Sequence, residues 1–374
     1  ALCTANLPEP TIGANSDTQS TNHFGVLTYT GNDGANRDIV SGGSGVGGEI
    51  DFTPDFVWHK SRNTTNWHLW FDSSRGATKL LGTNTDYQEQ TQADSLSDFV
   101  LNGFTVSHNA ATSDMNASVH TYVAWNWKVN GNSTSSVSGG TNITNGTSGN
   151  ATVQANTTSG ISIVTFQNTI RSTDFCTFPH GLGTTPDMIV LKSRTSSNYW
   201  AINHSALGLQ LGFLGTTPQS QAAFTASTFW NTINDTTVKF QSNGNIAGTN
   251  EDIVAYCFNS VEGYSKFGKY TGNGSADGPM IFTGFRPAFI LFKNATTSGT
   301  NWQLNDSVRD TFNVVNKRLA PSVVDAETSS TYQFGDFLSN GFKIRETDAS
   351  WNQSGNTYIY MAFAESPFKY ANAR

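Results

Sequence analysis

Histidines and carboxylates in the first quarter of the chain are the first candidates for chemistry. His59 and His68, with Asp72 nearby, could form a metal site or a proton relay on two adjacent strands. Two later segments align with this one and carry apolar residues at both histidine positions: Leu191 and Phe292 for His59, Trp200 and Trp302 for His68. Both histidines are therefore predicted to be packing residues rather than a functional pair.

Carboxylate pairs are the second candidate for catalysis. The nearest are Asp51 with Asp55 and Asp325 with Glu327. A glycosidase needs two carboxyl groups that face each other across a cleft about 5–10 Å wide. A distant pair could still meet in the fold, so spacing alone does not decide the question. A unit that recurs along the chain with varying polar positions is nevertheless a poor place for one active site, and we predict that the protein is not an enzyme.

His180 and two glycine-rich stretches complete the search for chemistry. His180 lies in a turn-rich stretch, where a surface or turn-stabilising role is expected. Residues 31–34 and 272–277 offer oxygen atoms but lack the spaced carboxylates and the bidentate glutamate of a calcium loop, so they are predicted to be hairpin loops. We predict no metal and no cofactor.

Tryptophan is abundant for a weakly charged chain, with nine residues. Trp58, Trp125, Trp127, Trp200 and Trp302 are assigned to packing, because they lie in apolar strands or share one position between aligned segments. Trp67, Trp230 and Trp351 are flanked by Asn, Thr and Ser. Exposed aromatic rings can stack on sugars, so these three are the candidates for glycan binding.

One sequence unit recurs three times, and these aligned segments must position the candidate residues. Pro54, Pro186 and Pro287 each precede an apolar run that ends in Lys six positions later. Downstream, the dipeptides Asp72-Ser73, His204-Ser205 and Asp306-Ser307 follow those prolines by 18, 18 and 19 residues. Lys60, Lys192 and Lys293, which end the runs, are expected to be solvent-exposed and to discourage edge-to-edge aggregation.

Each unit closes on a strictly alternating run. The large apolar positions are Val123, Trp125 and Trp127, then Val254, Tyr256 and Phe258, then Ile359, Met361 and Phe363. Alternation with period two predicts a strand buried on one face, with residues such as Ala124, Asn126 and Ala362 outside. Asn102-Gly103 and Asn340-Gly341 predict tight hairpin turns. The sequence therefore predicts an all-β fold of three tandem β-sandwich repeats, jelly-roll or concanavalin-like, of about 110 residues each.

The predicted boundaries divide the chain into five parts. They are an extended N-terminal segment at 1–22, repeats at 23–129, 159–261 and 262–374, and a linker rich in Asn, Gly, Ser and Thr at 130–158. Such a composition buries too little apolar area to offset ordering entropy, so the linker is expected to be flexible in isolation.

Composition excludes several partners. The net charge of -7 and the scattered Lys and Arg argue against nucleic acid and anionic membranes. No apolar run approaches the roughly 20 residues that cross a bilayer, so membrane insertion is not expected. Cys3, Cys176 and Cys257 form neither a disulfide framework nor a metal motif. A chain that starts at Ala1 is expected to be a processed or partial product.

Several blocks together resemble a repeat domain of otherwise unknown function in tail-fibre and virion structural proteins of marine and freshwater bacteriophages, including cyanophages. The resemblance covers residues 23–374, and its carriers are residues 52–58, 72–76, 122–125, 262–267 and 358–374. In such proteins residues 2–8 look like the exit from a preceding concanavalin-like or SPRY-like domain. The resemblance implies a virion or fibre role, in the virion or outside the cell, and supplies no catalytic residues.

We therefore expect a non-enzymatic phage structural protein of a tail fibre, surface fibre or capsid appendage that serves host attachment. The alternative is a secreted or fibre-borne carbohydrate-active protein, either a lectin-like module or a glycan depolymerase. Expected partners are other virion proteins, host surface glycan and further copies of the chain in a trimer or fibre, because subunit contacts would order the linker.

Overall fold

The computed structural model describes residues 12, 19–109, 111–171, 173–215, 219–329 and 334–365. Strands dominate these ranges, and their helical segments are three short 3-10 turns at Ser20–Asn22, Ser205–Leu207 and Gln219–Gln221. Within the same ranges no helix is long and apolar enough to cross a membrane. The predicted all-β class is confirmed. Cys3 and nearly all of the predicted N-terminal segment lie outside the described residues.

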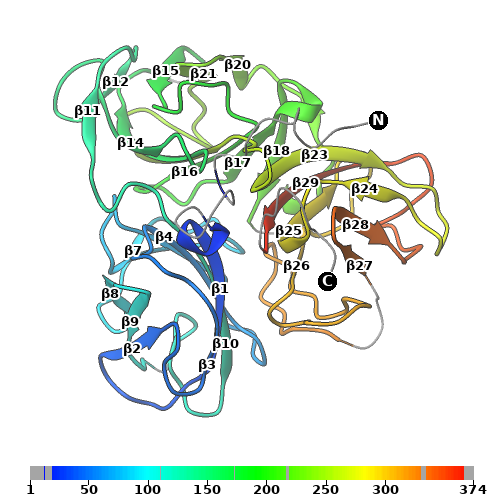
Figure 1. Cartoon of the computed structure of the whole chain (residues 1–374). Helices are drawn as coiled ribbons and strands as arrows, with labels where there is room; N and C mark the ends of the chain where they lie inside the picture. The colour runs from blue at the N-terminus through cyan, green and yellow to red at the C-terminus, as the bar shows by residue number, and fades with distance from the viewer. Residues whose placement is uncertain are drawn as a thin grey trace.

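The first sheet pair is built from residues 24–127 (Figure 1). Its large antiparallel sheet has the order β3-β1-β10-β4-β5-β6-β7. The strands are β1 (Phe24–Thr30), β3 (Val46–Gly48), β4 (Phe56–Ser61), β5 (Leu69–Asp72), β6 (Lys79–Gly82), β7 (Gln90–Thr91) and β10 (Thr121–Trp127). Its small sheet has the order β2-β9-β8, with β2 (Arg37–Val40), β8 (Leu96–Val100) and β9 (Gly103–Val106).

The second sheet pair follows the same plan over residues 135–258. Its large sheet has the order β11-β13-β14-β22-β16-β17-β18-β19, and β12 also pairs with β14. The strands are β11 (Ser135–Val137), β12 (Ile143–Thr144), β13 (Ala151–Asn156), β14 (Ile161–Asn168), β16 (Met188–Ser193), β17 (Trp200–His204), β18 (Gln210–Leu214), β19 (Thr225–Ala226) and β22 (Asp252–Phe258). Its small sheet is β15-β21-β20, with β15 (Phe175–Pro179), β20 (Trp230–Ile233) and β21 (Thr237–Gln241).

The third sheet pair covers residues 265–364. Its large sheet is β23-β29-β25-β26, with β23 (Ser265–Thr271), β25 (Pro287–Asn294), β26 (Gln303–Asp306) and β29 (Thr357–Ala364). Its small sheet is β24-β28-β27, with β24 (Met280–Phe282), β27 (Gly335–Leu338) and β28 (Gly341–Ile344). The two predicted Asn-Gly hairpins are present as β8–β9 and β27–β28, and Asn102 has the positive φ of 61° that such a turn needs.

The three large sheets face one another across one shared hydrophobic core. Aromatic residues from all three sheet pairs meet in it: Trp127 and Phe24 from the first, Tyr256 from the second, and Phe289 and Phe363 from the third. The rings of Phe24 and Phe363 stack with centroids 5.0 Å apart, and Phe56 and Tyr256 lie 5.1 Å apart. One core therefore joins the N-terminal, middle and C-terminal parts of the chain.

Each small sheet covers the other face of its large sheet and encloses a separate core. The closing strands β10, β22 and β29 are consequently buried on both faces. Val123, Trp125 and Trp127 are buried as predicted, but so are Ala124, Asn126 and Ala362. The expectation of a half-buried strand is wrong, because the large apolar residues enter the shared core and the small ones face the local core.

The segment 130–158 is not a flexible linker. It contains β11, β12 and β13, which pair with one another or with β14 and so widen the second large sheet. Gln154 on β13 donates from Nε2 to Asp55 Oδ1 at 2.8 Å, which ties the segment to the first sheet pair. Its ordering comes from backbone pairing within the same chain and from a few apolar side chains, such as Ile143 and Val153, that enter the second local core. Composition predicted flexibility because these apolar residues are few.

We call the contacts between two sheet pairs a seam. Buried ionic networks stabilise two of the three seams. At the first seam, between the first and second pairs, Arg75 bonds to Asp72 and Glu89, and Glu89 also accepts from Arg194 of the second pair. Tyr256 OH of the second pair donates to Asp72 Oδ2 at 2.7 Å. Burial raises the pKa of Glu89, but the hydrogen bonds from Arg194 and the charge of Arg75 outweigh it and lower the pKa below its ordinary value.

The second seam, between the third and first pairs, uses the same residue types. Arg309 bonds to Asp306 and Glu327, and Glu327 also accepts from Arg62. Trp125 Nε1 of the first pair donates to Asp306 Oδ2 at 3.0 Å. The carboxylates of Asp72 and Asp306, and the guanidinium groups of Arg75 and Arg309, have no exposed side-chain surface.

The third seam, between the second and third pairs, is largely apolar. Backbone bonds define the matching positions, since Glu89 N donates to Arg194 O, Glu327 N to Arg62 O and Phe224 N to Ala295 O. Phe224 and Ala295 thus replace a glutamate and an arginine. His204 and Leu207 stand where Asp and Arg occur at the other seams, and the His204 ring bonds through Nε2 to Tyr360 O at 3.1 Å.

Candidate functional site

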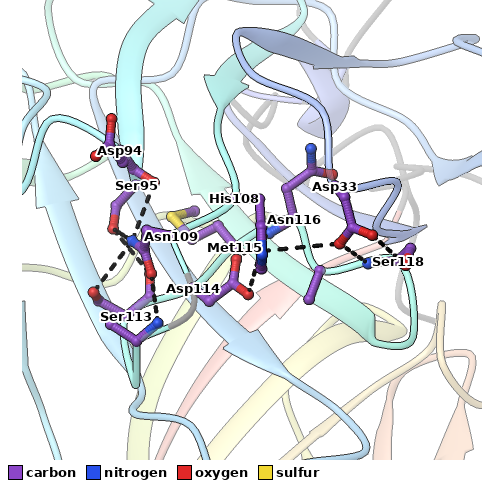
Figure 2. Close-up of polar contacts among 12 residues, drawn as sticks. Asp33, Asp94, Ser95, His108, Asn109, Ser113, Asp114, Met115, Asn116 and Ser118 are labelled. Atoms are coloured by element: carbon purple, nitrogen blue, oxygen red, sulfur yellow. Dashed lines mark hydrogen bonds and ion pairs between the residues drawn. The ribbon is translucent and has the colours of Figure 1, made fainter.

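Loops at one end of the first sheet pair bring together a cluster of polar side chains. The loops 31–36, 62–68, 83–89 and 107–120 all connect strand ends on this side, because neighbouring strands of the sheet run antiparallel. Asp, Asn, Ser and His residues from these loops lie beside one another in Figure 2. We call this region the loop end of the first sheet pair.

His108 joins two of these loops (Figure 2). Its Nδ1 lies 2.9 Å from Asp114 Oδ2 and 4.0 Å from Asp33 Oδ1. The side chain of Asp114 is 5% exposed and that of His108 is 34% exposed, so a buried carboxylate orients a ring that reaches solvent. This is the arrangement of an acid–base dyad.

The neighbouring hydroxyl does not complete a nucleophilic triad. Ser118 Oγ donates to Asp33 Oδ2 at 2.6 Å, and Ser118 N donates to Oδ1 of the same carboxylate at 2.7 Å. The Ser118 hydroxyl is therefore committed to Asp33, whose pKa these hydrogen bonds lower below its ordinary value. The geometry favours a clamp that fixes loop 31–36 against loop 107–120.

Buried asparagines hold the two glycine-rich stretches in place. Asn116 Nδ2 donates to Asn32 Oδ1 at 2.9 Å and to Gly34 O at 2.8 Å. Asn352 Nδ2 makes the matching bonds to Asn273 Oδ1 at 2.9 Å and Ser275 O at 2.7 Å. Their oxygen atoms thus serve hydrogen bonds within the loops. The hairpin prediction is wrong, because residues 31–34 connect β1 to β2 and residues 272–277 connect β23 to β24, and each of these strand pairs is divided between a large and a small sheet. Among the described residues no group of three or more His, Cys, Asp or Glu could hold a metal ion.

An aromatic pair lies at the same loop end. Trp67 is half-buried and Tyr87 is 50% exposed, and their rings lie 5.5 Å apart at 58°. Trp67 N donates to Thr112 O at 3.0 Å, which attaches the pair to the loop 107–120. Asn84 is 6% exposed, accepts from His68 N through Oδ1 at 2.7 Å, and leaves its Nδ2 without a partner. A tilted aromatic pair with one exposed ring can stack on a sugar ring, whereas the Asn84 amide is buried below the surface.

Trp230 and Trp351 are not exposed. Their exposed fractions are 1% and 0%, and Trp230 Nε1 donates to Ile202 O at 3.2 Å inside the second sheet pair. The expectation that they stack on glycan is wrong, because stacking needs an open ring face. The polar neighbours of Trp230, Asn231 and Thr232, are exposed residues of β20, while the ring itself enters the core. Of the three predicted tryptophans, Trp67 alone reaches the surface.

His59 and His68 are packing residues, as predicted. Both are fully buried, and burial lowers the pKa of His59 to about 3 and that of His68 well below its usual value. Tyr29 OH lies 2.9 Å from His59 Nε2, and Trp58 Nε1 donates to His68 Nδ1 at 3.3 Å. Each ring therefore remains neutral inside the first sheet pair.

Two of the four candidate carboxylates, Asp55 and Glu327, serve the scaffold, whereas Asp51 and Asp325 are exposed. Asp55 is 1% exposed and accepts from Ser73 Oγ, Gln154 Nε2 and the backbone N–H groups of residues 129, 131 and 132. Glu327 belongs to the second seam. His180 is buried at a turn, where its ring bonds to Asn234 O at 3.0 Å.

The three strand-end lysines are buried rather than exposed, so that prediction is wrong. Each has an exposed fraction of 0%, and each Nζ donates to carbonyls of a nearby loop. Lys192 bonds to the carbonyls of Asp86, Ser196 and Asn198, and Lys293 bonds to Asn294 O and Thr300 O. Burial lowers the pKa of all three to about 7. The lysines hold loops, and Lys192 also crosses the first seam.

A groove of about 510 Å³ runs along the second seam. It lies between β1 and β3 on one side and the third sheet pair on the other, with Glu49, Thr311 and Glu365 on its walls. Gly48 has φ 89°, and a side chain there would meet Val26 O, so only glycine allows β3 to lie this close to β1. No sequence pattern predicted this groove, because one wall comes from residues 21–49 and the other from residues 288–365.

Fold and site together define an all-β protein of three sheet pairs around a shared core, with a polar, aromatic-bearing loop end. The chain belongs to the family described as "Domain of unknown function (DUF7483)", whose family model matches residues 19–367. No curated protein and no solved structure matches the chain.

Proposed function

We propose that this chain is a non-enzymatic bacteriophage structural protein of a tail fibre, surface fibre or capsid appendage that serves host attachment. The observation that carries the proposal is the single shared core with buried seams, since an attachment protein needs a rigid body that presents loops to a host surface. The phage assignment rests on the resemblance described from the sequence. It places the protein in the virion or outside the cell.

We also propose that the rigid body is a ring of three β-sandwich repeats. The pairings Phe56–Asp72, Met188–His204 and Phe289–Asp306 support this, because they join matching positions of the aligned segments. In all three large sheets the closing strand lies between the opening strand and the strand at the recurring proline. The jelly-roll or concanavalin-like relationship belongs to the same proposal.

Particle labelling tests the virion assignment. Antibodies against the purified chain are applied to phage particles, and gold labels are located by electron microscopy. The proposal expects labels at one defined position, and added soluble chain should slow adsorption of the phage to its host. Particles that carry no label, with the chain found only in the soluble fraction of the lysate, would overturn the assignment.

The alternative is a carbohydrate-active protein, and the Trp67–Tyr87 pair favours its lectin-like form. A glycan array with the wild-type chain and Trp67→Ala tests it, with Tyr199→Ala as control, since Tyr199 precedes Trp200 as Trp67 precedes His68. Binding that Trp67→Ala alone removes would support the lectin. Reducing ends released from host polysaccharide would instead show a depolymerase and refute the non-enzymatic assignment.

Self-association is part of the proposal, with a trimer or a fibre as the options named from the sequence. The linker no longer supports it, because β11, β12 and β13 are ordered by their own chain. Partners in the assembly would be other virion proteins and host surface glycan. The surface that carries self-association must therefore come from the folded chain itself.

A further inference from the structure

We infer that β24 is a self-association edge, at which a second copy of this chain adds its own β24 in antiparallel orientation. The inference rests on the proposed self-association of the chain and assigns a surface to it. It predicts a two-fold dimer rather than a trimer, because two identical strands that pair antiparallel form a contact that closes on itself.

One side of the β24 backbone has no paired strand among the described residues. β24 ends the order β24-β28-β27, and within the described residues no strand pairs on its far side. Ile344 N donates to Pro279 O at 3.1 Å, and Thr283 N donates to Asn340 O at 3.0 Å. Because hydrogen bonding alternates along an antiparallel ladder, Ile281 bonds to β28 while the N–H and C=O groups of Met280 and Phe282 point away from it.

The side chains on this edge are apolar and exposed. Ile281 enters the local core at 7% exposure, whereas Met280 is 43% exposed and Phe282 is 65% exposed. An open apolar edge strand is a template for pairing with another chain, which proteins usually block with charge, proline or a covering segment. β24 (Met280–Phe282) contains no charged residue and no proline, and no described strand covers its open side.

The matching edges of the other two small sheets are blocked. β2 carries Arg37 and Asp38 on its edge. β15 ends in Pro179 and is covered by the segment 130–158, since Thr141 and Thr177 exchange backbone hydrogen bonds of 3.0 Å. The equivalent edge strand is thus protected from pairing in the first and second sheet pairs and unprotected in the third. This contrast argues that β24 has a binding role.

The identity of the partner follows from the strand itself. We place the two-fold axis of the dimer at Ile281, so that the Ile281 residues of the two copies lie opposite each other. Met280 of each copy then lies opposite Phe282 of the other copy. Methionine sulfur packs well against aromatic rings, and each copy offers the N–H and C=O that the other lacks. A second copy therefore satisfies both the backbone and the side chains of this edge.

Phe282→Lys is the direct test, measured by light scattering after size exclusion over a range of concentrations. Leu101→Lys is the matched control, because Leu101 is 70% exposed in the β8–β9 turn of the first sheet pair and is not part of β24. We expect a wild-type dimer, loss of that dimer in Phe282→Lys, and a control that remains dimeric. Circular dichroism and thermal midpoints verify that both variants fold.

Disulfide trapping tests the register. In a Cys3→Ser background, Met280→Cys and Phe282→Cys chains are oxidised separately and as a mixture. The pairing expects a disulfide-linked dimer that forms mainly in the mixture, because position 280 lies opposite position 282. Equal cross-linking of Phe282→Cys with itself would contradict this register.

The outcomes separate this inference from the proposed function. A wild-type oligomer that Phe282→Lys leaves intact refutes β24 as the surface, while the proposed oligomer stands. A wild-type chain that is monomeric at every concentration refutes both. Association with another virion protein that Phe282→Lys removes, without any dimer, would show an edge that serves a different partner and would overturn the second-copy inference.

Discussion

Arg309→Leu is expected to destabilise the second seam strongly. The guanidinium group of Arg309 has no exposed side-chain surface and bonds to Asp306, to Glu327 Oε2 at 2.9 Å and to Leu304 O at 3.4 Å. Leucine removes all three contacts and leaves the buried carboxylate of Asp306 without its counter-charge. Breaking a buried ion pair from one side costs about 3–5 kcal/mol.

The third seam supplies a control for this prediction. It uses His204, Leu207, Phe224 and Ala295 at the matching positions, so the chain already contains an apolar version of the contact. The apolar version is introduced at the second seam by four substitutions together: Asp306→His, Arg309→Leu, Glu327→Phe and Arg62→Ala. This variant removes the buried charges of Asp306 and Arg309 together with the charges of their partners Glu327 and Arg62. Replacing a whole buried ionic cluster by apolar residues is often neutral, so most of the lost stability should return.

Urea unfolding followed by tryptophan fluorescence measures both variants. The reasoning predicts a free energy of unfolding about 3–5 kcal/mol lower for Arg309→Leu and a value closer to wild type for the four-residue variant. A loss below about 1 kcal/mol for Arg309→Leu, the range of an exposed ion pair, would refute the claim that this network is buried and holds the seam.

Three further predictions follow from burial. Trp127→Ala should lower the free energy of unfolding by about 3–5 kcal/mol in urea, because a cavity opens in the shared core; a smaller loss would mean that the core is loosely packed. The pKa values of His59 and His204 in the folded chain are about 3 and 4. Below pH 6.5 these two histidines therefore bind protons in the unfolded chain but not in the folded chain, which lowers the free energy of unfolding. A pH series of urea melts should show a loss of about 2 kcal/mol per histidine at pH 5. A flat profile there would contradict neutral buried rings. Lys293 has a folded pKa of about 7, so stability should rise between pH 7 and 10.5, and Lys293→Met should reduce that slope; an unchanged slope would place the amine in water.

The sequence predicted local features that depend on spacing along the chain. Alternation and Asn-Gly turns identified the closing strands and hairpins, and alignment of the segments identified His59 and His68 as packing residues. It also selected Trp67, whose neighbours are polar because they lie in exposed loops. Trp351 has similar neighbours but enters a core, since flanking residues do not reveal which way a ring points.

Features that depend on contacts between distant segments were not predictable from one sequence. The sequence predicted the lysines to be exposed edge charges because it does not show the carbonyls that bind them. Those around Lys192 come from its own loop and from Asp86 of another sheet pair. Alternation predicted one buried face because nothing in a strand shows that a second sheet covers its other side. The seams likewise depend on pairs such as Arg62 with Glu327, which lie 265 residues apart.

Scanning calorimetry tests the central claim most directly, because a ring with one shared core must unfold as a unit. The account predicts a single transition whose calorimetric enthalpy equals the van't Hoff enthalpy. Two or three separate transitions, each with a lower enthalpy, would show that the sheet pairs fold independently and would contradict the closed ring.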